Sequence, residues 1–407
     1  MPLLPTRLMR GGADPRSLGI SVLLTGLVAL GAVSTDLYLP SLPAMVDYFG
    51  VDVSLVQLTL SVFAIGMALG MVLHGPLSDR FGRRPVVLGG LFLYSVASVA
   101  CVLAPDIHFL IAARFVQALG ACGGVVVGRA IVRDVYGVEG SARMLSYMTS
   151  AMALAPALAP ILGGWLHAAF GWWANFLVLV GFGAVMLFCV AVFLRETNAH
   201  RDPSAISPIA MGRNYLTLLR NRIYLGHALV VAFTFGGLFS FISGSSFVII
   251  DVLGVDARNF GFVFFFFAMS YTLGAICGGR VSRRLGLAWL INLGLGVSIV
   301  ADLSGVALAW MGVESVWSVM PFICGHSLAC AFIMPNGMAG AIGPFPRMAG
   351  AASSLLGFTQ MAVGSIAGYA VGVFHDGTTR SLMTSIGICA VLALASWSLL
   401  VGIRKKA

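Results

Sequence analysis

The segment Gly75-Pro76-Leu77-Ser78-Asp79-Arg80-Phe81-Gly82-Arg83-Arg84-Pro85 is a short charged stretch between two long apolar runs, at about residues 54–75 and 86–104. Part of it occurs twice along the chain. A shift of 204 residues superimposes four of its residues on identical ones, Gly75, Ser78, Arg80 and Gly82 on Gly279, Ser282, Arg284 and Gly286. An apolar run of about 20 residues can cross a bilayer as a helix. A polar loop that recurs between such runs predicts two related halves of a membrane protein.

The composition is that of a polytopic membrane protein. The 407-residue chain is 59% hydrophobic and 10% charged, with a mean hydropathy of +0.98, whereas soluble domains are about a quarter charged. This excludes an ordinary soluble enzyme. At about 33 residues for each span and its loop, the length is filled by twelve spans, and we expect no separate soluble domain.

Twelve apolar runs are bounded by charged or turn-forming residues. We expect membrane-spanning helices at about 18–45, 54–75, 86–104, 108–128, 143–166, 174–194, 224–250, 259–279, 287–310, 316–336, 349–373 and 381–403. The longest polar interruption divides them six and six. We therefore predict an all-α membrane protein with two pseudo-symmetric six-helix halves, residues 1–194 and 223–407, joined by a cytoplasmic linker, residues 195–222.

The net charge of +9 reports membrane topology rather than a nucleic-acid surface. With the N-terminus inside, 21 of the 24 Lys and Arg residues fall on one side of the membrane; Arg258 and Arg380 fall on the other, and Arg114 lies within a span. Basic residues in short loops are retained in the cytoplasm. Both termini are therefore predicted to be cytoplasmic, residues 1–16 are interpreted as a tail rather than a removed signal peptide, and no nucleic-acid partner is expected.

The sequence carries no pattern typical of an enzyme or of a metal site. All seven cysteines lie inside apolar runs without paired spacing, and we interpret them as small hydrophobic residues. There is no H-E-x-x-H or G-x-S-x-G motif, no cluster of acids and no phosphate-binding loop. We expect a protein that is not an enzyme and that needs no metal, no cofactor and no ATP.

Small residues repeat every fourth position in spans five and eleven. The two rows are Ala155, Ala159, Gly163 and Gly364, Gly368, Gly372. Such rows allow helix backbones to approach closely in lipid, so we expect equivalent helices of the two halves to pack together. The residues predicted to form a hinge in span five are Pro156, Pro160, Gly163 and Gly164.

Four stretches resemble known transporters. Residues 75–85 resemble the loop signature of the major facilitator superfamily. Residues 34–43, Ser-Thr-Asp-Leu-Tyr-Leu-Pro-Ser-Leu-Pro, resemble span one of its Bcr/CflA group of drug:proton antiporters. Residues 114–120 are similar to the antiporters' Arg-x-x-Gln-Gly motif, with Ala118 after the glutamine, and residues 155–164 are similar to their span-five motif, with Ala159-Pro160 in place of Gly-Pro.

The resemblance implies an exporter, acting as a monomer in the bacterial inner membrane, that exchanges protons for amphiphilic antibiotics of the phenicol or bicyclomycin type. It needs no cofactor, because the proton gradient drives it. The loop residues implied to latch the halves together are Gly75, Asp79, Arg80, Gly82 and Arg83. In physical terms, Gly82 forms a tight turn, and the arginines can pair with Asp79 or with helix C-termini.

Ionisable residues within spans are costly and point to function. They are Asp36, Arg114, Asp302, His326 and His227. Asp36 and Arg114 lie at a similar depth, roughly 10 Å below the outer boundary. The face of Arg114, Gln117, Ala121 and Gly128 is expected to line a shared cavity.

Burial disfavours the charged form of a carboxyl group, whereas an arginine keeps its charge. Asp36 is therefore the expected proton carrier, and Arg114 its modulator or relay partner. Alternatively, Asp36 caps a helix break at Pro40 and Arg114 is a hydrogen-bonding hub. For Asp302, His326 and His227 we favour packing roles over proton relay.

The drug is expected to contact residues of both halves. The residues we select are Tyr38, Gln117, Phe239, Asn336 and Gln360. An apolar cavity with few polar groups suits varied amphiphiles. A single carboxylate that serves the proton favours neutral drugs over permanent cations. The remaining alternatives are an exporter or symporter of an endogenous metabolite and, with less support, a passive channel.

Overall fold

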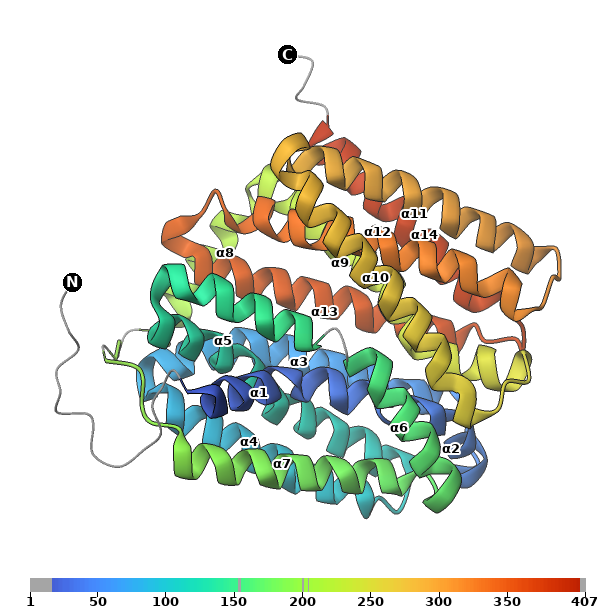
Figure 1. The fold of residues 1–407 in the computed structure, drawn as a ribbon, viewed down its shortest axis with the longest axis horizontal. Coiled ribbons are helices and arrows are strands. Elements are labelled where there is room, and N and C mark those ends of the chain that lie inside the picture. The colour runs from blue at the N-terminus through green and yellow to red at the C-terminus, as the bar shows by residue number, and fades with distance from the viewer. Residues whose placement is uncertain (1–16, 153–154, 200, 204, 403–407) are drawn as a thin grey trace.

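The structure is a computed structural model that describes residues 17–152, 155–199, 201–203 and 205–402. Every regular element in these residues is a helix (Figure 1). The first half contains α1 (Leu18–Asp36), η2 (Leu39–Ser41), α2 (Leu42–Phe49), α3 (Val53–Phe81), α4 (Arg83–Val102), α5 (Ile107–Met152), α6 (Ala155–Phe170) and α7 (Trp173–Phe193). The remainder contains α8 (Pro208–Leu219), α9 (Arg222–Ser246), η3 (Phe247–Val252), α10 (Ala257–Leu285), α11 (Leu287–Trp310), α12 (Val316–Ile342), η4 (Pro346–Met348), α13 (Ala349–Val373) and α14 (Arg380–Leu400).

Eleven helices among the described residues are long and apolar enough to cross a membrane. The remaining span is interrupted. Helix α5 passes through Gly137, whose φ of 67° is not helical, and ends at Met152, while the apolar α6 has only 16 residues. Together the end of α5 and α6 occupy the position of the predicted fifth span, and the all-helical membrane fold expected from the sequence is confirmed.

Span one is not the continuous helix predicted for residues 18–45. Helix α1 ends at Asp36, a 3₁₀ turn follows at Leu39–Ser41, and α2 continues to Phe49. The cause is a pair of prolines, because Pro40 and Pro43 have no N–H group to donate to the carbonyls four residues earlier. The break thus lies directly beside Asp36.

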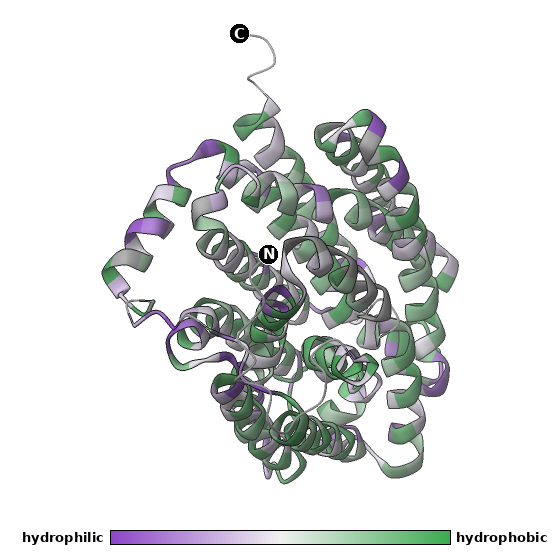
Figure 2. Cartoon of the chain, turned by 60° about the vertical axis from the view of Figure 1, so that its left-hand side comes forward, coloured by the Kyte–Doolittle hydropathy of each residue, from purple (hydrophilic) through white to green (hydrophobic). Residues whose placement is uncertain are grey.

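The two halves lie against each other, the first drawn blue to green and the second yellow to red (Figure 1). They meet along α3 and α13 and along α6 and α10. Hydrogen bonds between described residues also cross between them: Gln57 Nε2 donates to the Ser243 carbonyl at 3.0 Å, and Ser365 Oγ donates to the Ser61 carbonyl at 2.8 Å. Hydrophilic residues gather at helix ends and in connecting segments (Figure 2).

The segment between the halves contains a helix that was not predicted. Helix α8 begins at Pro208, a favoured first residue of a helix. Its Leu218 is fully buried beside Tyr224 and Leu356, and Tyr215 OH and Ser354 Oγ share a hydrogen bond of 3.0 Å. The apolar side of α8 therefore packs on the second half.

Candidate functional site

Arg114 is completely enclosed within the first half. Its Nη1 donates a hydrogen bond to Gln117 Oε1 at 2.5 Å, and Gln117 Nε2 donates to Ser98 Oγ at 2.8 Å. The i, i+3 spacing of Arg114 and Gln117 places both side chains on one face of α5. This chain of hydrogen bonds ties α5 to α4.

Aromatic rings surround the charged group of Arg114. Its Cζ lies 4.2 Å from the ring centroid of Phe63, 4.5 Å from that of Tyr38 and 5.7 Å from that of Phe176. A cation over a desolvated aromatic ring gains about 2 kcal/mol. The Nε and Nη2 atoms are nevertheless buried without a hydrogen-bond partner in the described part of the chain. The site therefore holds a positive charge that is only partly compensated.

Asp36 is the last residue of α1 and is 4% exposed. Its carboxyl group makes no hydrogen bond or ion pair with any described residue, and in particular none with Arg114. A buried carboxyl group without a partner is costly when charged. The arrangement favours a group that binds a proton and releases it when its surroundings change.

The polar and small face of α5 is buried in this conformation. Gln117 and Ala121 are fully buried, and Gly128 is also buried. The helix packs tightly along this side, since a Cβ on Gly120 would lie 2.5 Å from the backbone nitrogen of Tyr94. Small residues permit this approach of α5 to α4. The cavity expected along this face of α5 stays a prediction.

The residues selected for drug contact lie in different surroundings. Tyr38 stacks on Arg114, and its hydroxyl shares a 3.0 Å hydrogen bond with Thr59. Phe239 is buried against α13, and Asn336 Nδ2 donates to the carbonyl of Phe332 in its own helix at 2.7 Å. Gln360 is half-buried and makes no hydrogen bond with described residues. Its amide is thus available to a ligand.

A separate hollow lies in the second half. It has a volume of about 540 Å³ and is lined by α9, α13, α14 and Trp310 of α11. Its rim includes the exposed side chains of Ile366 and Phe374. None of the residues selected for drug contact lines it.

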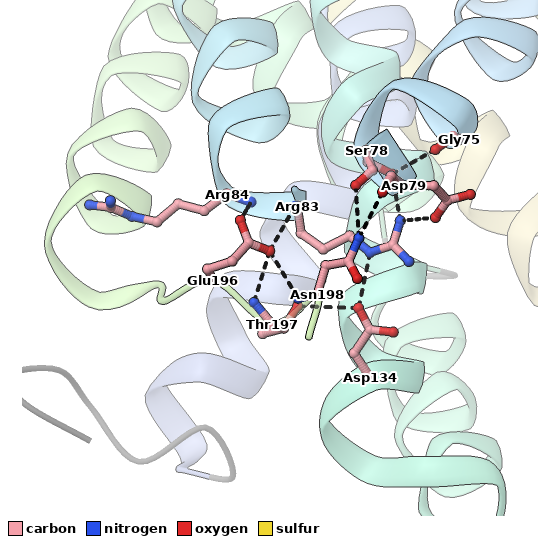
Figure 3. Close-up of polar contacts among 9 residues, drawn as sticks. All are labelled: Gly75, Ser78, Asp79, Arg83, Arg84, Asp134, Glu196, Thr197 and Asn198. Carbon is pink, nitrogen blue, oxygen red and sulfur yellow. Dashed lines mark hydrogen bonds and ion pairs between the residues drawn. The ribbon is translucent and has the colours of Figure 1, made fainter. Parts of the chain in front are cut away.

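The loop of residues 75–85 is held together by charge (Figure 3). Gly82, with φ of 104°, connects α3 to α4. The guanidinium of Arg83 bridges two carboxylates, Asp79 Oδ1 at 2.5 Å and Asp134 Oδ2 of α5 at 2.9 Å. Arg84 Nη2 donates to the Ala191 carbonyl at 2.8 Å, in the last turn of α7. Arginine thus pairs both with an acid and with a helix C-terminus, as the sequence analysis expected.

Glu196 is a further member of this site that the sequence analysis did not identify. Its carboxylate accepts hydrogen bonds from the backbone N–H groups of Arg83 at 2.8 Å and Arg84 at 3.3 Å, at the start of α4 (Figure 3). A Cβ at position 82 would displace this carboxylate, and the φ of 104° by itself favours glycine at this position. An acid at a helix N-terminus is favourable. Glu196 lies 113 residues from Arg83 in the sequence, so the sequence pattern did not indicate this contact.

The contacts of this loop stay within the first half and the following segment. Arg80 has its guanidinium over the ring of Phe81 at 5.4 Å. Asn198 Nδ2 donates to the Asp79 carbonyl at 3.1 Å. A Cβ at Gly75 would meet nothing within 4 Å. Among the described residues, Asp79, Arg80 and Arg83 make no hydrogen bond or ion pair with the second half, so a latch between the halves remains a prediction for another conformation.

Removal of the Glu196 carboxylate is expected to destabilise the protein. Glu196→Ala leaves two N–H groups of α4 uncapped, which costs about 1–2 kcal/mol. The measurement is thermal unfolding of purified protein in detergent. Glu314→Ala is the control, because Glu314 is exposed and makes no hydrogen bond or ion pair with described residues. Equal melting temperatures for the two variants would contradict the capping role.

Span five touches both halves through its small residues. Gly163 lies so close to the Leu37 carbonyl oxygen, at the break in span one, that a Cβ there would overlap it. Gly164 lies against the Ala257 carbonyl of α10 in the second half, where a Cβ would come too close to the oxygen. Pro160 stands inside α6, and Pro156 is its second residue. Helix α6 therefore links the surroundings of Asp36 to the interface between the halves.

Comparisons with known proteins agree with this architecture. The family model described as Major Facilitator Superfamily matches residues 23–369. A bicyclomycin resistance protein homolog of Haemophilus influenzae is 29% identical, over 94% of this chain and 96% of its own. Multidrug resistance protein D of Escherichia coli is 27% identical, over 93% and 95%. The crystal structure of a bacterial homolog of the human lysosomal transporter Spinster, inward-facing and occupied, superimposes with a TM-score of 0.72 at 15% identity, covering 97% and 98%.

Proposed function

Because the chain belongs to the major facilitator superfamily, and is therefore a multi-pass membrane transporter rather than an enzyme, we propose that it exports amphiphilic antibiotics in exchange for protons. The observation that carries this proposal is the buried, unpaired carboxyl group of Asp36 at the break in span one. The relatives named for bicyclomycin and multidrug resistance support a drug as the cargo.

Asp36 is the proposed proton carrier, and Arg114 keeps a fixed positive charge in the same half. A neutral Asp36 is compatible with its apolar surroundings, while an ionised Asp36 requires water or a partner. In this proposal, drug binding favours the ionised form of Asp36 and proton binding favours its neutral form, so the two compete. Because the protein does not bind the drug and the proton at the same time, entry of a proton drives release of the drug.

The contact of Gly163 with Leu37 couples the protonation of Asp36 to the movement of the two halves. Leu37 follows Asp36 directly, and α6 packs on α10 through Gly164. A change at the break in span one is thus passed through α6 to the second half. In this proposal the two halves rock about the contact between α6 and α10. The hinge of this movement is formed by Pro156, Pro160, Gly163 and Gly164.

The proposed setting is the bacterial inner membrane, with both termini cytoplasmic and the protein acting as a monomer without a cofactor. The hydrogen bonds from Gln57 and Ser365 join the halves in the part of the bundle away from the termini. With cytoplasmic termini, this conformation is closed toward the outside. The loop latch would then contact the second half in the conformation that is open toward the outside. Its residues are Gly75, Asp79, Arg80, Gly82 and Arg83.

Neutral drugs are the expected substrates, because one carboxyl group cannot easily bind both the proton and a permanent cation. The test is uptake into proteoliposomes with an imposed pH gradient, comparing a neutral phenicol with a quaternary ammonium dye. We expect gradient-dependent transport of the phenicol. Robust dye transport without phenicol transport would contradict the substrate class, and no transport of any antibiotic would favour an endogenous metabolite as cargo.

A further inference from the structure

A second buried acid and base meet in the other half of the molecule. His326 of α12 and Asp302 of α11 are 1% and 3% exposed, and His326 Nδ1 lies 2.8 Å from Asp302 Oδ2. Ser298 Oγ donates to the same carboxylate oxygen at 2.5 Å. His326 Nε2 lies 3.2 Å from the carbonyl oxygen of Thr234 in α9. The imidazole thus joins three helices of the second half.

The hydrogen-bond partners of the His326 ring determine how many protons the ring and Asp302 hold between them. A backbone carbonyl only accepts hydrogen bonds, so Nε2 must carry a proton. A neutral imidazole then has a bare Nδ1, which would face the lone pairs of an ionised Asp302 at 2.8 Å. One further proton must lie between Nδ1 and Oδ2. It makes either an imidazolium with a carboxylate or an imidazole with a carboxylic acid, and both combinations are electrically neutral overall.

We propose that His326 and Asp302 form a second proton-binding site, separate from Asp36, which is loaded and closed off from water in this conformation. The ligand of this site is a proton. A role for this proton in transport rests on the proposed function, but the presence of the proton on the pair does not.

Among the described residues, the titratable side chains that interact electrostatically with the pair are the thiols of Cys330 on α12 and Cys389 on α14. The Cys330 thiol in turn interacts with Tyr271 of α10, and α9 contributes Thr234, which does not titrate. None of these groups carries a positive charge that could replace the proton. Loss of the proton would leave a net negative charge in an apolar interior, at a cost of several kcal/mol.

Tight packing keeps the ring in place. A Cβ on Gly237 of α9 would lie 2.6 Å from His326 Cε1, and one on Gly325 would lie 2.8 Å from Cβ of Ala301 on α11. The imidazole therefore cannot turn away from both acceptors while the three helices stay together. The proton can exchange only when α9, α11 and α12 separate.

The test counts protons on the pair directly in the purified full-length protein. Nuclear magnetic resonance of ¹⁵N-histidine reports whether each ring nitrogen carries a proton, with His326→Gln assigning the signal. The infrared carbonyl band of a carboxylic acid, assigned with Asp302→Asn, reports the acid. At about pH 8, where a free imidazole is neutral, we expect either two ring protons with a carboxylate or one ring proton with a carboxylic acid.

One ring proton together with an ionised Asp302 would overturn the proposal. Asp302→Asn is expected to leave His326 with a single ring proton. His227→Gln is the matched control and leaves the His326 signal unchanged, because His227 Nδ1 contacts only the Ile223 carbonyl of its own helix. Asp36→Asn should also leave the count unchanged. Failure of drug transport would refute the exporter proposal without altering this count, so the two proposals fail separately.

Discussion

Asp36→Asn is expected to abolish drug accumulation driven by a pH gradient while leaving drug exchange across the membrane intact. Asparagine has nearly the size of aspartic acid and stays neutral, so it imitates the protonated state of a carboxyl group that has no partner in the described part of the chain. The variant should fold, because burial favours the neutral form. It cannot release a proton, so transport loses its driving force.

The measurement compares uphill uptake and drug counterflow in the same proteoliposomes. We expect uphill uptake to fall to the level of protein-free vesicles, with counterflow preserved. Asp47→Asn is the control, because Asp47 lies in α2 of the same span and is exposed. Uphill uptake by Asp36→Asn equal to that of the native protein would remove Asp36 from the coupling mechanism.

Gly163→Ala is expected to have the largest effect on stability. The new Cβ would overlap the Leu37 carbonyl oxygen, and a backbone atom cannot move aside as a flexible side chain can. Helix α6 must then separate from the break in span one. Overpacking of this kind costs up to about 3 kcal/mol, and we expect a lower melting temperature together with impaired transport.

Gly89→Ala is the matched control for this substitution. Gly89 lies inside α4, and a Cβ there would meet nothing within 4 Å. Alanine is favoured over glycine in a helix interior by about 1 kcal/mol, so this variant should be as stable as the native protein or more so. Equal melting temperatures for Gly163→Ala and the native protein would show that α6 does not pack on the Leu37 carbonyl.

The helical architecture was predictable because lipid requires long apolar helices. Eleven of the twelve predicted spans correspond to described segments that are long and apolar enough to cross a membrane, although the first of them is broken after Asp36. The tight turn at Gly82 was predictable because glycine beside charged residues is typical of a helix-to-helix turn. The close approach of α6 at Gly163 followed from the row of small residues.

The polar contacts over long sequence distances were not predictable. The sequence analysis treated Asp302 and His326 as separate packing residues, but they lie 2.8 Å apart on neighbouring helices. The role of Glu196 depends on how the chain returns to α4 after α7. The aromatic rings around Arg114 come from three different spans. Hydropathy fixes which segments cross the membrane, but not how helices rotate and pair.

Proton release on drug binding tests the central claim most directly. A neutral phenicol is added to purified protein in lightly buffered detergent solution, and the pH change is compared between the native protein and Asp36→Asn. We predict release by the native protein that disappears in the variant, because drug and proton compete through Asp36. Release that persists unchanged in Asp36→Asn, or no release by native protein with any of several antibiotic classes, would contradict the account.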